Sequence, residues 1–170
     1  ATRDGRMDFS YFDTLIDAAN RRSLKVVGKI GGGYNGNRPI APPWTRHLNE
    51  TAYLAALKRY AETTTQHFAG RIPSFALENE FNIPNVHTLI GWRVGIWTPD
   101  FMDQVMQTLA HAVQTHAPDA EIIISITPLA GFESGIERMN KLIDYDVVGV
   151  HTYPVGFVPD LALAENIKSQ

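Results

Sequence analysis

The segment that decides the fold is residues 71–82, RIPSFALENEFN. It begins as a short apolar run, which is typical of a buried strand, and it ends abruptly in Glu78, Asn79 and Glu80. In parallel α/β folds the active site lies at the carboxyl ends of the strands. The segment therefore predicts a strand of a parallel sheet with an amide and two carboxylates at the end where such folds keep their chemistry.

Strand and helix patterns alternate on both sides of this segment. Apolar runs predict strands over residues 24–30, 72–79, 121–127 and 146–151. Helical spacing of apolar residues predicts helices over residues 10–22, 49–70, from 98 past 113, and 136–143, with a weak pattern over 161–168. Ser10 and Asp13 form an S-x-x-D cap, Thr98 caps the helix that Pro99 opens, and Gly70 ends another helix.

This alternation predicts a single α/β domain over residues 1–170. Strands that are apolar on both faces favour parallel βα units with right-handed crossovers. Four strands make about half of a (β/α)8 barrel, which usually needs ~250 residues. An open flavodoxin-like sheet of four or five strands also fits the length of the chain.

The composition argues against several classes of function. With 15 basic and 18 acidic side chains the formal net charge is −3, so nucleic acid is not an expected partner. No run approaches the ~20 apolar residues that cross a bilayer, and no signal-peptide pattern opens the sequence, so we expect no membrane association. The absence of cysteine excludes disulfides and thiolate chemistry. It suits an exported protein, secreted or periplasmic, as well as a cytosolic one, and the compartment stays open.

The sequence predicts neither a cofactor nor a metal site. Gly31–Gly33 follows a predicted strand but continues into neither a G-x-G-x-x-G pattern nor a P-loop. His111 and His116 lie five residues apart on a predicted helix and do not share a face. The other histidines without ligand spacing are expected on the surface: His47, His67 and His87.

Glu80 is the first candidate for acid chemistry. Apolar neighbours such as Phe75 and Phe81 would disfavour its charged form and raise its pKa toward the range of a general acid. The alternative is a surface carboxylate at a strand end, which position alone favours. A second polar group follows another predicted strand: His151 and Tyr153, two residues apart, point to the same side of an extended chain. Their alternative is a core histidine and an interfacial tyrosine, but polar groups at two strand ends of one sheet favour a site.

A strand that ends in Asn-Glu and a later strand that ends in His-x-Tyr resemble the clan A glycoside hydrolases, which are retaining (β/α)8 glycosidases. Residues 7–30 resemble the second helix and third strand of these barrels, and residues 73–85 the fourth strand. The fifth and sixth strands would be EIIISITPLAG and VVGVHTYP.

The resemblance implies roles for four residues. Glu80 would be the general acid/base, and Asn79 would bind the sugar 2-hydroxyl and the nucleophile. His151 and Tyr153 would line the subsite where cleavage occurs. Trp44, in a loop after a predicted strand, is a further candidate to stack on a sugar, although ordinary packing is as good an explanation. Trp92 and Trp97 have similar positions.

Departures from the family pattern leave the subfamily open. Phe81 stands where proline often follows the acid/base, Phe75 stands where tryptophan often opens the strand, and Glu78 has no family role. The nucleophile, which the family places on the seventh strand, is missing. Glu121 opens its strand at the opposite end, and neither Glu133 in a loop nor the predicted helical Glu165 is a suitable substitute.

The sequence thus leaves three hypotheses. The first is a segment of a glycoside hydrolase that is catalytically incomplete alone and associates with a second copy or with the missing barrel half. The second is a non-catalytic carbohydrate-binding or structural α/β domain derived from such an enzyme. The third is an unrelated open sheet with a coincidental Asn-Glu pair.

Overall fold

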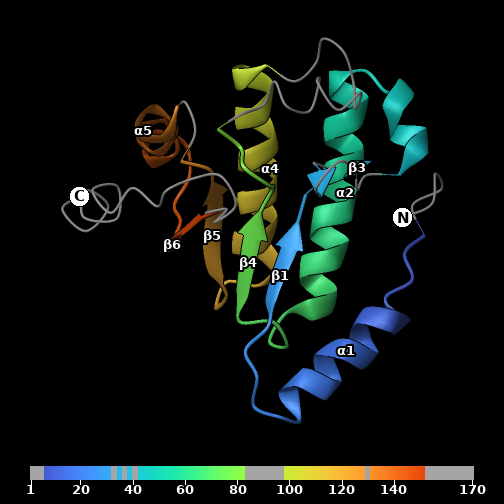
Figure 1. The fold of residues 1–170 in the computed structure, drawn as a ribbon. Helices are drawn as coiled ribbons and strands as arrows, with labels where there is room; N and C mark the ends of the chain where they lie inside the picture. Colours follow the sequence, from blue (N-terminus) through green and yellow to red (C-terminus); the bar gives the residue numbers. More distant parts are fainter. Residues whose placement is uncertain are drawn as a thin grey trace.

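The fold is a parallel α/β sheet covered by helices (Figure 1). The computed structural model describes residues 6–31, 34–35, 38–39, 42–82, 98–128 and 131–151. The sheet has the strand order β1-β4-β5-β6, and all its pairs are parallel. Its strands are β1 (Val27–Ile30), β4 (Ser74–Leu77), β5 (Glu121–Ile126) and β6 (Val147–Val150).

The helices agree with the predicted alternation. They are α1 (Ser10–Asn20), α2 (Glu50–Phe68), α4 (Pro99–His116) and α5 (Phe132–Leu142). A short antiparallel pair, β2 (Tyr34–Asn35) and β3 (Arg38–Pro39), and a 3-10 helix (Pro43–His47) lie between β1 and α2. None of the helices in the described ranges is long and apolar enough to cross a membrane.

The core lies between the sheet and the pair α2 and α4, which run side by side on one face (Figure 1). Phe75 and Leu77 of β4 and Ile124 of β5 are completely buried, as are Val105 and Leu109 of α4. The Thr65 hydroxyl of α2 donates to the Ala61 carbonyl of its own helix at 2.8 Å and also lies 3.2 Å from the Ala112 carbonyl of α4. The central strand β4 is buried at every position, as the apolar run predicted.

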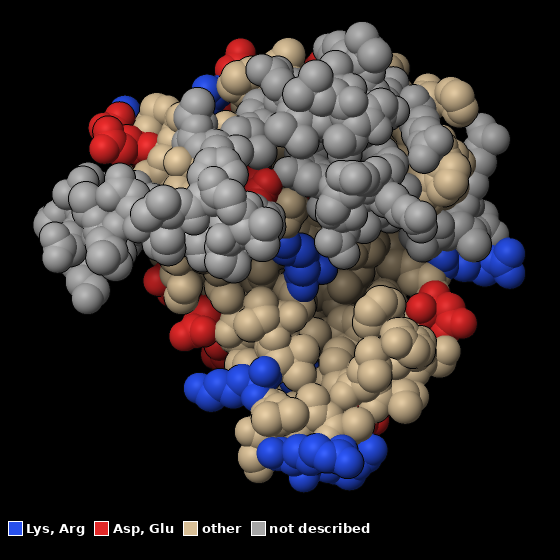
Figure 2. All heavy atoms as spheres, viewed as in Figure 1, with Lys and Arg blue, Asp and Glu red and all other residues tan. Residues whose placement is uncertain are grey.

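The strand order distinguishes the two folds that the sequence left open. The strands lie side by side in the same order in which they follow along the chain. In a flavodoxin-like sheet the strand order instead reverses at the first strand. The face opposite α2 and α4 is exposed at Val27 and Val147. Figure 2 shows that much of the described surface on this side is uncharged. Consecutive order and helices on one face are the architecture of a barrel segment.

Two of the three predicted caps are correct. The Thr98 hydroxyl accepts a hydrogen bond from the Phe101 amide at 3.1 Å, and Pro99 opens α4. Gly70 follows α2 with φ +71°, and the Arg71 amide bonds back to the Phe68 carbonyl at 3.0 Å. Only glycine adopts this left-handed conformation at little cost. The turn therefore ends α2 and directs the chain into β4.

The predicted Ser10–Asp13 cap is wrong. The helix begins at Ser10 with Phe9 at the N-cap, and the Asp8 carboxylate accepts from the Ser10 amide at 3.0 Å. Asp13 instead faces residues distant in the sequence. A second correction concerns α5, which begins at Phe132 instead of residue 136 because Gly131, with φ +84°, turns the chain directly into the helix. The predicted helix over residues 161–168 lies outside the described residues.

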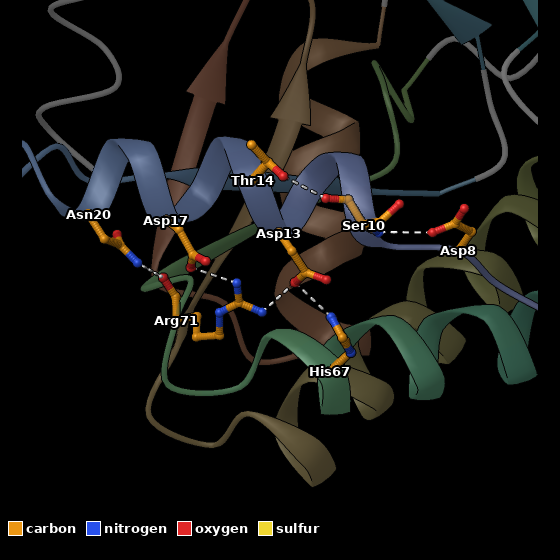
Figure 3. A network of polar contacts seen from close by, with 8 residues as sticks. All are labelled: Asp8, Ser10, Asp13, Thr14, Asp17, Asn20, His67 and Arg71. Atoms are coloured by element: carbon orange, nitrogen blue, oxygen red, sulfur yellow. Dashed lines mark hydrogen bonds and ion pairs between the residues drawn. The ribbon is translucent and has the colours of Figure 1, made fainter.

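Polar contacts hold α1 against the end of α2 (Figure 3). The Asp13 carboxylate accepts from His67 Nε2 at 2.8 Å and from Arg71 Nη1 at 2.5 Å. Arg71 Nη2 also donates to Asp17 at 2.8 Å, and Asn20 donates to the Arg71 carbonyl at 3.4 Å. His67, expected only as a surface residue, thus joins two helices. We call these five residues the α1 clamp.

Apolar packing of α1 is less complete than its polar contacts. A cavity of about 420 Å³ lies between α1, β1 and α2, with Phe12, Leu15 and Phe75 in its lining. Phe12 and Leu15 remain 54% and 48% exposed. Phe9 compensates in part, because its ring stacks on His67 with 4.4 Å between the centroids. The α1 clamp therefore supplements the apolar packing of α1, in which Ile16 is the buried residue.

Replacing Asp13 by Asn should lower the melting temperature at neutral pH much more than at about pH 2. Hydrogen bonds from Arg71 and then from His67 lower the pKa of Asp13 below its ordinary value of 3.8. Because the folded pKa is the lower one, the stabilisation is present above the unfolded pKa and is lost as pH falls through the folded pKa. Circular dichroism melts of D13N beside the exposed control D144N test this. Equal effects of D13N at both pH values would contradict it.

The two outer strands lead to a prediction about association. Among the described residues, β1 and β6 each pair along one side only. Unpaired strand edges beside exposed apolar side chains favour addition of further strands. We expect self-association of the 170-residue chain, or its assembly with the remaining part of a barrel, in size-exclusion chromatography with light scattering. A clean monomer across a wide concentration range would count against this.

Candidate functional site

The register places the carboxyl ends of all four strands at one edge of the sheet. Ile30 pairs with Leu77, Leu77 with Ile124, and Ile126 with Val150. The segment Glu78–Glu80 follows β4 directly, and His151 follows β6. The two motifs singled out in the sequence therefore share this edge.

Glu80 and His151 are in contact although β5 separates their strands. Glu80 Oε1 lies 3.1 Å from His151 Nδ1. Only 5% of the Glu80 side chain is exposed, against 27% for His151, so the carboxyl is buried and the imidazole faces the surface. Backbone hydrogen bonds to β5 fix the chain at both residues. The Phe81 amide, next to Glu80, donates to the Ser125 carbonyl at 3.3 Å, and the His151 amide donates to the Ile126 carbonyl at 2.8 Å.

The backbone after β4 turns through unusual conformations. Glu78 and Glu80 have φ of +47° and +48°, which costs a residue other than glycine about 1 kcal/mol or more. An extended chain would direct both side chains to one side. Here Glu80 faces β6, and Glu78 lies at the end of β1. The two carboxylates of one strand end are therefore turned to different neighbours.

Gly31 provides the space for Glu78. A Cβ at Gly31 would lie 2.8 Å from Glu78 Oε2 and 2.9 Å from its Cα, and the φ of Gly31 is +148°. Glu78 is 1% exposed, and its Oε1 accepts from the Asn79 amide at 3.1 Å. Burial raises the pKa of the Tyr60 phenol, and the negative charge of Glu78 raises it further. In the sequence, Gly31–Gly33 was considered only as a phosphate loop, and nothing in its pattern indicated this packing role.

Lys29 is the second residue that sequence reasoning missed. Its Nζ donates to Asn79 Oδ1 at 2.5 Å. Lys29 as a whole is exposed, but its ammonium is partly withdrawn from water; this desolvation lowers the pKa of Lys29, and the negative charges of Glu78 and Glu80 partly offset the effect. The one available signal was the charge of Lys29 in an apolar strand, two residues before Gly31. The site therefore contains an ammonium, two carboxylates, an amide and an imidazole.

Asn82 ties the segment after β4 to the end of β5. Its Nδ2 donates to the Thr127 carbonyl at 2.9 Å, and its Oδ1 accepts from the Thr127 amide at 3.1 Å. Gly135 of α5 packs against this asparagine, because a Cβ there would lie 3.1 Å from Asn82 Cβ. These contacts fix the chain directly after Glu80.

The other candidate residues of the sequence analysis lie either outside the described residues or in other elements of the fold. Tyr153, Trp92, Trp97 and Glu165 lie outside the described residues. Trp44 is half-buried in the 3-10 helix. Glu121 lies at the opposite end of β5, where it accepts from the Ser74 hydroxyl at 2.8 Å, and Glu133 is in the first turn of α5. In the part of the chain that the structure describes, no cluster of three His, Asp or Glu side chains is arranged to hold a metal ion.

Solved structures with a similar fold include two xylanases and a GH53 catalytic domain. An endo-1,4-beta-xylanase, XylE, from Penicillium canescens matches with a TM-score of 0.73 and 18% identity over 99% of this chain and 54% of that one. The GH53 catalytic domain from Ignisphaera aggregans matches with a TM-score of 0.68 and 15% identity over 86% and 42%. A GH10 xylanase from Thermobacillus composti matches with a TM-score of 0.65 and 17% identity over 96% and 49%.

The chain has the fold of part of a (β/α)8 barrel. It spans about half the length of the solved structures it matches. The predicted fold class is confirmed, and the resemblance to clan A glycoside hydrolases is confirmed at the level of the fold. No family model matches the sequence, and a comparison with curated proteins found no match.

Substituting Gly31 with Ala should destabilise this barrel segment more than the same change at Gly70. Both positions have positive φ, but a Cβ at Gly70 meets nothing within 4 Å. Gly70→Ala should cost about 1 kcal/mol of unfolding free energy for the backbone alone. Gly31→Ala also displaces the buried Glu78 carboxylate and should cost about 3 kcal/mol. Urea unfolding measures both, and equal losses would contradict the packing role of Gly31.

Proposed function

We propose that this chain is a segment of a retaining glycoside hydrolase in which Glu80 is the general acid/base on O-glycosidic bonds of poly- or oligosaccharides. The observation that carries the proposal is the buried Glu80 carboxyl at the carboxyl edge of the sheet, 3.1 Å from His151 Nδ1. The likeness of the fold to glycoside hydrolase barrels supports it.

Burial suits Glu80 for proton transfer. The Glu80 side chain is buried, and burial disfavours a carboxylate relative to the protonated acid, whereas the nearby ammonium of Lys29 favours the carboxylate. His151 orients the carboxyl group through its Nδ1 and remains partly exposed to a ligand. In this proposal Glu80 protonates the leaving oxygen and later deprotonates the attacking water.

Asn79, Tyr153 and Trp44 complete the proposed sugar site. Asn79 adjoins Glu80 and offers an amide to a sugar hydroxyl. Tyr153 and Trp44 would contribute an aromatic hydroxyl and an aromatic face, both of which bind sugars through hydrogen bonding and stacking. No cofactor is part of the proposed reaction.

The proposed reaction needs a second carboxylate, about 5 to 5.5 Å from the first. Glu78 is unsuitable, because it lies against Gly31 at the end of β1. The nucleophile would come from a further strand of the barrel. By itself, the segment should therefore bind sugar without turning it over.

The catalytic role of Glu80 is tested in the chain joined to the barrel part that supplies the nucleophile. This protein should hydrolyse an aryl β-glycoside with retention of configuration, and Glu80→Gln should lower the rate about 10²- to 10⁴-fold. Glu137→Gln, on the exposed face of α5, is the control. Unchanged turnover of the correctly folded E80Q protein would remove Glu80 from the mechanism.

A second candidate function is a non-catalytic carbohydrate-binding or structural domain derived from such an enzyme. The orientation of Glu78 favours it, because Glu78 cannot act as the second carboxylate beside Glu80. Calorimetry discriminates the two. Saccharide binding without turnover in the joined protein, unchanged by Glu80→Gln, would support the binding domain.

A further inference from the structure

We infer that Lys29 is a positioning residue for Asn79: it holds the carboxamide oxygen, so that the amide NH₂ group is presented as a hydrogen-bond donor to the ligand. The inference rests on the proposed function, which it deepens by assigning the polarity of one contact in the sugar site. The fold likeness does not assign Lys29 any role.

The identity of the bonded atoms follows from the chemistry of lysine. An ammonium group has three donors and no acceptor, so the Asn79 atom that lies 2.5 Å from Nζ must be the carbonyl oxygen. This settles which way the carboxamide is turned. The other end, Nδ2 with two hydrogens, then points away from Lys29.

The position of Lys29 in the sheet makes the contact possible. Lys29 pairs in register with Ala76, and Asn79 lies three residues further along the chain. The long side chain of Lys29 spans this distance, as the contact of its Nζ with Asn79 Oδ1 shows.

Neighbouring negative charges favour the protonated form of Lys29 that this contact needs. Glu78 and Glu80 both favour the ammonium form and partly offset the effect of burial on its pKa. A hydrogen bond from a charged donor is roughly twice as strong as a neutral one. Tyr60 also interacts with Glu78, and burial together with the negative charge of Glu78 raises the pKa of its phenol, which stays neutral.

Asn79 is held on its main chain as well. Its amide N–H donates to Glu78 Oε1 at 3.1 Å, and the residue is 9% exposed. The main chain of Asn79 and its carboxamide oxygen are therefore both held in place. The Nδ2 group is the part of Asn79 that can donate to a ligand. A sugar hydroxyl oxygen has the lone pairs to do so, and the arrangement selects such an acceptor over a ligand that offers only a donor.

The contact is tested first without any ligand. In a uniformly ¹⁵N-labelled full chain, the Nδ2 pair of Asn79 is assigned as the signal lost in Asn79→Asp. Lys29→Met keeps the side-chain length and removes the ammonium, and it should shift this pair more than any other asparagine pair. Lys29→Arg should restore a position near wild type, and Lys25→Met, an exposed neighbour, is the control. An unmoved pair in K29M would overturn the inference.

A titration with xylotetraose tests the consequence for binding. The affinity of Lys29→Met should be about fivefold lower than that of wild type, the loss expected for one hydrogen bond, and Lys29→Arg should recover most of it. Equal affinities of wild type and K29M would overturn the inference even where the amide signal moves. No binding of xylotetraose by wild type would count against a xylo-oligosaccharide as the ligand of the proposed site, and the amide signal alone then decides the role of Lys29.

Discussion

The point at which β4 stops is the constraint on which the rest of the structure depends. β4 is buried at all four positions between β1 and β5, so its register fixes where the chain leaves the sheet. The Glu78 amide still bonds to the Ile30 carbonyl at 2.8 Å, and the next backbone bond, from Phe81, goes to Ser125 of β5. Within three residues the chain thus crosses from a backbone bond with β1 to a backbone bond with β5. Glu78, Asn79 and Glu80 receive their different surroundings from this crossing.

The crossing requires strained backbone, which neighbouring contacts stabilise. Left-handed φ at Glu78 and Glu80 together costs about 2 kcal/mol or more. Gly31 removes the steric conflict on one side, and the paired bonds between Asn82 and Thr127 hold the chain on the other. Strain of this kind persists only where the surroundings over-determine the conformation. The strained backbone and these contacts give the two glutamates different surroundings. Glu78 is packed against Gly31, and Glu80 is the candidate acid.

Local pattern was enough to predict the sheet but only part of the site. Apolar runs gave β4 and β5 because burial on both faces leaves a local signature, and the order of strands follows from chain order in a barrel segment. The Ser10–Asp13 cap was wrong because the Asp13 carboxylate binds the guanidinium of Arg71, 58 residues further along the chain, and not a backbone amide at the start of its own helix. The contacts of Lys29 and Gly31 depend on register and on left-handed backbone, neither of which has a local sequence pattern. The contact between Glu80 and His151 could be expected from the sequence, because the carboxyl ends of parallel strands lie at the same edge of a sheet.

The incompleteness of the fold and that of the proposed chemistry have one cause. In the described residues β1 and β6 pair on one side each, and the cavity beside α1 lies next to the unpaired side of β1. Further strands there would cover Val27 and Val147 and would add side chains to the edge that carries Glu80. A retaining mechanism needs a carboxylate across the glycosidic bond from the acid, and an adjacent position on the same strand end, such as Glu78, cannot supply that geometry. Closing the sheet is thus the physical condition both for burying its open face and for giving Glu80 a reaction partner.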